Sequence, residues 1–212
     1  ARWMDRVEKT EMDSLGVDIA AGGKDNMVIY PRHGSWFDMP KKIPGVEIPQ
    51  DKAGPIAASH VIMARRDRAV VHADVIGWGL SCCNYLTDND VQTVAVNFAS
   101  GSMERTHDGK LKFANMRAQV IWRMREALDP QNPVPTYLPP IPELKADLAS
   151  YKWELRPAGI FIKSKEDQKK ELGRSPDDGD ACCLANIATI KTAVFDDMLF
   201  KAKAIDRYKE LD

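Results

Sequence analysis

The order of apolar and polar residues predicts short strands at the start of the chain and helices later. Residues 15–20 (LGVDIA) form a buried apolar run, and the glycines and polar residues of AAGGKD after it are typical of a hairpin turn. Residues 26–43 then predict a second strand and a third. Residues 49–67 have helical spacing and end in a basic cluster. The first third is therefore expected to be strands followed by a helix.

The middle of the chain alternates between strand and helix patterns. Residues 69–79 (AVVHADVIGWG) form a second apolar run, and residues 80–89 predict a helix. Residues 91–100 predict another strand, a polar loop follows it, and residues 115–128 (NMRAQVIWRMREAL) predict an amphipathic helix. This alternation after hairpins predicts an α/β fold with a mixed β-sheet flanked by helices.

Prolines and helix caps mark the last third. Proline-rich residues 130–142 predict a linker or an extended segment, and residues 150–164 predict two short strands. Ser164 with an acid three residues later predicts a capped helix that stops at Gly173.

A second helix start follows at once, in SPDDGDACC. Ser175 is expected at the N-cap, Pro176 at the first helical position and Asp178 at the third. The last residues also have helical spacing. We expect residues 1–14 to be a linker or N-terminal extension, residues 15–192 to be one domain and residues 193–212 to be a helical tail.

The composition allows one sizeable core and gives no strong overall electrostatic field. The 212 residues are 44% hydrophobic, and 30 Lys and Arg stand against 31 Asp and Glu, for a net charge of -1. An anionic partner such as nucleic acid would therefore have to be bound by local positive charge. No apolar run approaches the length of a membrane span, and the amino terminus has no signal-peptide character, so no membrane association is expected.

The sequence excludes two common motifs, the phosphate-binding P-loop and the cysteine zinc site. In GVDIAAGGKDN, Asp18 occupies the position where a P-loop needs glycine, and Asp25 follows Lys24 where a Ser or Thr is needed. The cysteines form two adjacent pairs without the spacing of a zinc site, and we expect buried thiols.

Single acids inside apolar runs are the strongest sign of chemistry. Asp18 lies in the first strand, Asp74 ends a later one, and Asp177 and Asp180 share a face of the late helix. Such charges are costly to bury unless they are paired or bound to a cation. Asp178 points elsewhere, and we assign it to helix capping. Carboxylates without His or Cys suit Mg²⁺ or Mn²⁺, and two such ions would activate water and stabilise the leaving oxygen of a phosphodiester.

With these residues the chain resembles the nuclease domain of the large terminase subunit of tailed bacteriophages, which has an RNase H-like fold. The matching stretches, in the family's order between residues 15 and 190, are GVDIAAGGKDN, HADVIGWGLSCCNYL, NMRAQVIWRMREAL and KKELGRSPDDGDACCLA. The resemblance implies a metal-dependent endonuclease that cuts concatemeric, double-stranded viral DNA during genome packaging in the host cytoplasm. It also implies an ATPase motor domain in the full-length protein, with the portal and the small terminase subunit as partners.

The resemblance also implies roles for individual acids. Asp18, Asp74 and Asp180 match the catalytic metal ligands for two Mg²⁺ or Mn²⁺ ions, Asp177 matches a flanking position, and Asp25 lies near an accessory acid of some relatives. The most familiar RNase H relatives have Glu as the second ligand. This chain has Asp there, and its shorter side chain reaches less far toward a metal ion. We expect Asp180→Asn to abolish cleavage without loss of stability, and Asp178→Asn to cut DNA normally with slightly lower stability.

Basic residues crowd the segment before the acidic helix, namely Lys163, Lys165, Lys169, Lys170 and Arg174. They could lead DNA phosphates to the metals, or form a solvated helix face with ion pairs to Glu166 and Glu171. Two other functions stay open: another RNase H-like nuclease, such as a junction resolvase or transposase, and a non-catalytic docking domain of a packaging motor.

Overall fold

A mixed six-stranded sheet forms the centre of the molecule in the computed structural model, which describes residues 3–4 and 10–188. The helical tail predicted for residues 193–212 lies outside these residues. The sheet order is β3-β2-β1-β5-β6, with β4 paired to β2. The strands are β1 (Ser14–Asp18), β2 (Asn26–His33), β3 (Trp36–Phe37), β4 (Lys41–Pro44), β5 (Val70–Asp74) and β6 (Thr93–Val96).

Strand direction brings two of the predicted acids to one edge of the sheet. β1 and β2 form the predicted antiparallel hairpin, whereas β1, β5 and β6 run parallel. Val17 is paired with Ala73, so Asp18 and Asp74 end neighbouring strands. The carboxyl ends of parallel strands are where α/β folds usually bind ligands.

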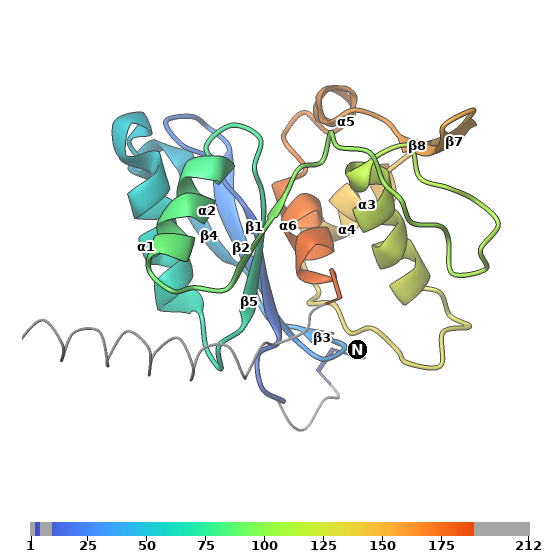
Figure 1. Cartoon of the computed structure of the whole chain (residues 1–212), viewed down its shortest axis with the longest axis horizontal. Helices are drawn as coiled ribbons and strands as arrows, with labels where there is room; N and C mark the ends of the chain where they lie inside the picture. The colour runs from blue at the N-terminus through green and yellow to red at the C-terminus, as the bar shows by residue number, and fades with distance from the viewer. Residues whose placement is uncertain (1–2, 5–9, 189–212) are drawn as a thin grey trace, which may run out of the picture.

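Helices cover both faces of the sheet (Figure 1), with α1 and α2 on one face and α3, α4 and α6 on the other. The helices are α1 (Ala53–Ala64), α2 (Gly79–Asp88), α3 (Met116–Ala127), α4 (Pro142–Ser150), α5 (Lys165–Leu172) and α6 (Asp177–Ala185), with short 3₁₀ turns at Gly45–Glu47 and Gln50–Lys52. Each face has its own apolar core. In β2, Met27 belongs to the core under α1 and α2, and Val28 to the core under α6. Because β2 is covered on both sides, its apolar run is continuous rather than alternating.

The third part of the chain adds a helix that the sequence pattern did not predict. The two short strands expected between residues 150 and 164 are present as the hairpin of β7 (Trp153–Arg156) and β8 (Gly159–Ile162). The proline-rich segment before them ends in α4, which begins with Pro142 at a position where proline's missing N–H costs nothing. We had expected only a linker or extended chain up to that proline.

The predicted start of α6 is wrong by one position. The helix begins at Asp177, Pro176 occupies the N-cap, and no N-cap side chain accepts a hydrogen bond there. Instead Asp147, from α4, accepts a hydrogen bond from the Gly179 N–H at 3.0 Å. Ser175 is therefore not the cap, because an acid distant in sequence caps this terminus. The helix ends at Ala185.

Gly16 lets α6 lie directly against β1. A Cβ atom at this position would lie 2.0 Å from the Ala181 carbonyl oxygen and 2.3 Å from the Ala185 nitrogen. Only glycine permits this approach of two backbones. The contact fixes the second half of α6 against the middle of β1. The first turn of the helix, with Asp177 and Asp180, then lies on the side of Asp18, where Lys165 contacts all three acids.

The four cysteines are buried free thiols, as expected. Among the residues that the structure describes, no helix has the length and apolar character needed to cross a membrane.

Candidate functional site

Three of the predicted acids meet around one lysine. Lys165, on α5, has its Nζ 2.8 Å from Asp18 Oδ2, 3.2 Å from Asp180 Oδ2 and 3.6 Å from Asp177 Oδ1. Asp180 is 1% exposed, and Asp18 and Asp177 are each 8% exposed. The folded chain therefore concentrates negative charge at the junction of β1 and α6 and places the half-buried Lys165 ammonium among the three carboxylates.

Asp74 lies beside this cluster on the next strand. Its Oδ1 accepts a hydrogen bond from the Ile76 N–H at 3.2 Å, and its carboxylate interacts electrostatically with the Asp18 carboxylate and the Lys165 ammonium. Gly79, at the start of α2, makes room for this turn, because a Cβ there would lie 1.7 Å from the Asp74 carbonyl oxygen. The structure thus brings Asp74 to the same sheet edge while its carboxylate is oriented by its own loop.

Asp25 and Lys169 lie at the mouth of the same site. Their side chains form an ion pair with 2.6 Å between Nζ and Oδ2. A cavity of about 340 Å³ is lined by Asp18, Ile19, Ala20, Asp25, Lys165, Glu166, Lys169, Ser175 and Asp177. This cavity joins most of the acids assigned from the sequence with two of the predicted basic residues.

The other predicted DNA-binding residues have protein partners. Lys163 pairs with Glu171 at 3.1 Å, and Lys170 contacts Asp167 at 3.8 Å. Arg174 lies 2.6 Å from the buried Asp147. Glu171 is one of the two ion-pair partners that the sequence suggested for these basic residues. Arg174 lies between α4 and α6, where it pairs with Asp147.

Asp178 lies apart from the cluster, as its predicted direction required. It is 4% exposed, and its Oδ2 accepts from Lys42 Nζ at 2.7 Å. The side chain thus links α6 to β4, which a capping role on the helix terminus alone did not predict.

Arg117 and Tyr151 are site residues that sequence reasoning missed. Arg117 NH1 lies 3.1 Å from Asp180 Oδ1 and 3.3 Å from Oδ2, and the Tyr151 hydroxyl donates to Oδ1 at 2.8 Å. A signal for Arg117 was available, because it lies on the buried stripe of α3 with Ile121 and Met124. A charged residue on the apolar face of a helix requires a partner.

Burial and neighbouring charges shift the pKa values of the acids in different directions. Burial raises the pKa of Asp18 to about 7, and the neighbouring carboxylates add to the shift while Lys165 opposes it. Burial also raises the pKa of Asp74 to about 6. Burial disfavours the charged form of Asp180 too, but Arg117 and Lys165 outweigh it and hold the pKa of Asp180 below its ordinary value.

Lys165 and Tyr151, which contact the acid cluster, both stay protonated at neutral pH. Burial works against the charged form of Lys165, but Asp18 and Asp180 raise its pKa above the ordinary value. Burial and the Asp180 carboxylate raise the pKa of Tyr151 well above its ordinary value. Lys165 is therefore an ammonium ion and Tyr151 a hydroxyl donor at neutral pH.

The donor set is all oxygen, which is the set that Mg²⁺ and Mn²⁺ take. In the part of the chain that the structure describes, no three His, Cys, Asp or Glu side chains form a ready metal site. The Lys165 ammonium lies between three of the carboxylates. The Lys165 ammonium is therefore the cation of this cluster, and the carboxylate oxygens around it are ligands of the type that a divalent ion binds.

A mixed sheet with acids at the ends of its central parallel strands defines an RNase H-like α/β fold. Within this class, the fold is that of the nuclease domain of phage large terminase subunits. Both the predicted fold class and the resemblance stated from the sequence are confirmed.

Solved structures carry this likeness. The nuclease domain of the large terminase subunit gp2 of bacterial virus Sf6 has a TM-score of 0.66 and 19% identity over 89% of this chain and 93% of that chain. A mutant of that domain with manganese and beta-thujaplicinol has a TM-score of 0.68 at 17% identity over the same shares, 89% and 93%. The large terminase nuclease from thermophilic phage G20c with bound magnesium has a TM-score of 0.52 at 14% identity, covering 85% of this chain and 82% of that chain. No family model and no curated protein matches the sequence.

Proposed function

We propose that this domain is a divalent-metal-dependent DNA endonuclease that cuts concatemeric viral DNA during genome packaging in the host cytoplasm. The observation that carries the proposal is the meeting of Asp18, Asp177 and Asp180 around the Lys165 ammonium, with Asp74 on the adjacent strand end. Solved domains of the same fold contain manganese or magnesium, which supports the choice of ion.

Asp18, Asp74 and Asp180 would hold two Mg²⁺ or Mn²⁺ ions, with Asp177 and Asp25 beside them. Two such ions supply an activated water and stabilise the leaving oxygen of a phosphodiester. Asp180 is suited to this role because it stays ionised, and α6 fixes it against β1 through the contact at Gly16.

Lys165 is the group that must move for a metal to bind. Its ammonium occupies the centre of the carboxylates, and its side chain is 35% exposed, so it has a route to solvent. Once displaced, Lys165 would lie at the mouth of the cavity with Lys169 and bind the DNA phosphate that approaches it. In the full-length protein, an ATPase motor domain, the portal and the small terminase subunit would deliver double-stranded DNA to this site.

The test is plasmid cleavage by the purified chain. We expect nicking or linearisation with Mn²⁺ or Mg²⁺, none in EDTA, and none with Asp18→Asn. Asp88→Asn is the matched control because Asp88 is an exposed acid at the end of α2. Equal cleavage in EDTA would contradict the metal mechanism.

Two other results would favour the remaining functions. A dimer that cuts branched DNA far faster than linear duplex would favour a resolvase or transposase. A chain that binds neither Mn²⁺ nor Mg²⁺ would favour a docking domain whose acids serve only to pair with Lys165, Lys169 and Arg117.

A further inference from the structure

The two carboxylate oxygens of Asp180 have different surroundings. Oδ1 accepts from the Tyr151 hydroxyl at 2.8 Å and from Arg117 NH1 at 3.1 Å. Oδ2 lies 3.3 Å from the same guanidinium nitrogen and 3.2 Å from Lys165 Nζ. The two shorter contacts are thus made to Oδ1, whereas Oδ2 contacts the lysine at the centre of the acid cluster.

Arg117 is itself held in place by three other elements. Its NH2 donates to Gln168 Oε1 at 2.5 Å, and Gln168 Nε2 donates to Ser150 Oγ at 3.3 Å. Its guanidinium lies 5.5 Å from the centroid of the Phe98 ring and 5.8 Å from that of Tyr151. The guanidinium therefore has a fixed position between α5, the end of α4 and the turn after β6 that contains Phe98.

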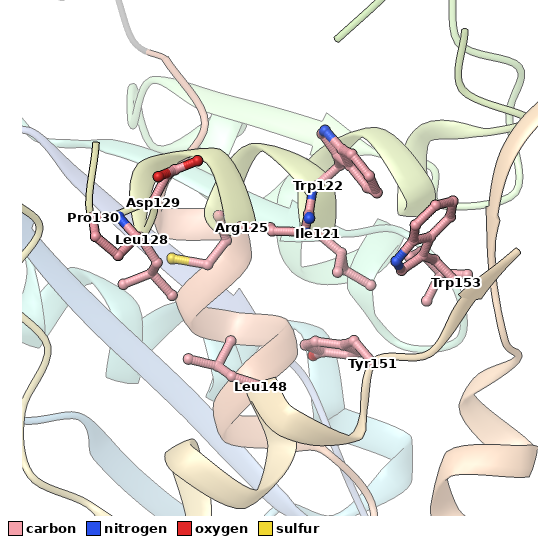
Figure 2. A pocket seen from close by; sticks show the side chains of 11 residues that line it. Ile121, Trp122, Arg125, Leu128, Asp129, Pro130, Leu148, Tyr151 and Trp153 are labelled. Atoms are coloured by element: carbon pink, nitrogen blue, oxygen red, sulfur yellow. The ribbon is translucent and has the colours of Figure 1, made fainter. Parts of the chain in front are cut away.

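Tyr151 packs against the apolar core under α6. Its ring lines a second cavity, of about 490 Å³, together with Ile121, Leu148 and Trp153 (Figure 2). The residue follows α4 directly, and a Cβ on Gly179 would lie 2.6 Å from its hydroxyl oxygen. The close approach of α4 to α6 at this glycine is what lets the hydroxyl reach Asp180.

We infer that Arg117 and Tyr151 are positioning residues that act through Asp180. They hold Oδ1 and so direct Oδ2 at the place where a divalent cation would replace the Lys165 ammonium. The inference rests on the proposed function, since the metal-dependent reaction is what the orientation serves. A purely structural ion pair would stabilise the fold, whereas a positioning pair must also change the affinity of the site for metal.

The first test compares Tyr151→Phe with Tyr30→Phe. Tyr30 is the matched control because its buried hydroxyl belongs to the core and has no hydrogen-bond partner among the residues that the structure describes. Free Mn²⁺ is measured by electron paramagnetic resonance during titration, without DNA. We expect Tyr151→Phe to bind Mn²⁺ about tenfold more weakly than the wild type, and Tyr30→Phe to bind it equally well. In plasmid cleavage, kcat should fall for Tyr151→Phe while KM for DNA is unchanged.

Equal Mn²⁺ affinity of Tyr151→Phe and the wild type would overturn the inference while leaving the proposed function intact. A wild type that binds no Mn²⁺ would instead overturn the proposed function, and the inference with it. The two failures are therefore distinguishable.

The second test compares Arg117→Lys with Arg117→Met at equal folded fraction, checked by thermal melting in EDTA. A lysine keeps the charge near Asp180 but not the two-nitrogen reach to Asp180 and Gln168. We expect an Mn²⁺ affinity between those of the wild type and the methionine variant. A folded Arg117→Met protein with wild-type affinity would overturn the role of Arg117. If Arg117→Met does not fold, Arg117→Lys decides by itself, and wild-type affinity in that variant would overturn it.

Discussion

Lys165 carries the positive charge that three buried carboxylates share. The sequence indicated the acids, but it did not indicate the role of the lysine. Asp18 stood out because it interrupts an apolar run, and Asp177 and Asp180 stood out because they share one face of the late helix. Asp18 lies beside Asp180 once α6 packs on β1. The partners did not stand out, because Lys165 resembles every other lysine of a charged helix. Its role depends on contacts from elements about 150 residues apart in the chain.

The expected effect of Asp180→Asn on stability is changed by these contacts. From the sequence we expected no loss, since clustered carboxylates repel one another. The structure pairs Asp180 with the buried Arg117 and with Tyr151, and loss of the negative charge would leave the guanidinium uncompensated. We now expect destabilisation by about 2–4 kcal/mol in urea unfolding. A stability equal to that of the wild type would contradict the pairing.

Replacing Lys165 by methionine should strengthen metal binding and weaken the metal-free fold. The ammonium occupies the place that a divalent ion would take, so its removal ends the competition. It also leaves the carboxylates without their cation, at a cost of about 1–2 kcal/mol after allowance for the partly exposed side chain. Calorimetric Mn²⁺ titration and thermal melts in EDTA measure the two effects. Lys170→Met, on the exposed side of α5, should change neither.

The metal-free protein should lose stability as pH rises from about 4 to about 7. The pKa of Asp18 is about 7 in the folded chain, above its ordinary value of 3.8, so the folded state keeps a proton that the unfolded state releases. The free energy of unfolding falls with pH wherever the folded state binds more protons. Thermal melts in EDTA across this range measure the slope. Asp18→Asn should flatten it, and an unchanged slope in that variant would assign the effect to another group.

At the scale of elements, the errors fall where a local pattern depends on a distant partner. The hairpin, the parallel strands and α3 follow from apolar spacing and were predicted. The start of α6 was placed from a serine and a proline, whereas Asp147 of α4 caps it. Helix α4 was missed because prolines dominate the segment before it. Its buried side chains, such as Leu144, pack in the same core as α6, and that packing partner cannot be identified from the local sequence.

Asp147→Ala should therefore destabilise the protein far more than Ser175→Ala. Asp147 is fully buried, accepts from the Gly179 N–H and pairs with Arg174. Its loss should cost about 2–4 kcal/mol, whereas an alanine at Ser175 should cost less than about 0.5 kcal/mol. Urea unfolding of the two variants decides the matter. The reverse order of the two losses would restore the serine cap that the sequence suggested.

At the scale of the whole molecule, the net charge is -1, so under the proposed function DNA would have to be held by the basic residues around the cavity. Lys165 and Lys169 are already paired with acids, so a phosphate must compete with Asp18 and Asp25 for them. Bound divalent ions would neutralise those acids and release both lysines at once. Metal binding and DNA binding should consequently strengthen each other, although the isolated domain has no strong field of its own.

DNA binding by this domain should be weak and should fall steeply with salt. Each phosphate contact contributes about 0.9 to the slope of log affinity against log salt concentration. Lys169→Ala should reduce the slope by about 1 in Mn²⁺, measured on a cleavage-resistant phosphorothioate duplex so that every metal ligand is kept, because one phosphate contact is lost. Lys110→Ala should leave the slope unchanged, since Lys110 lies in the 101–112 loop beside Asp108 and does not line the acid-bearing cavity. Fluorescence anisotropy with a short duplex between low and physiological salt provides the measurement. Equal slopes for Lys169→Ala and Lys110→Ala would show that DNA does not approach the acids along α5.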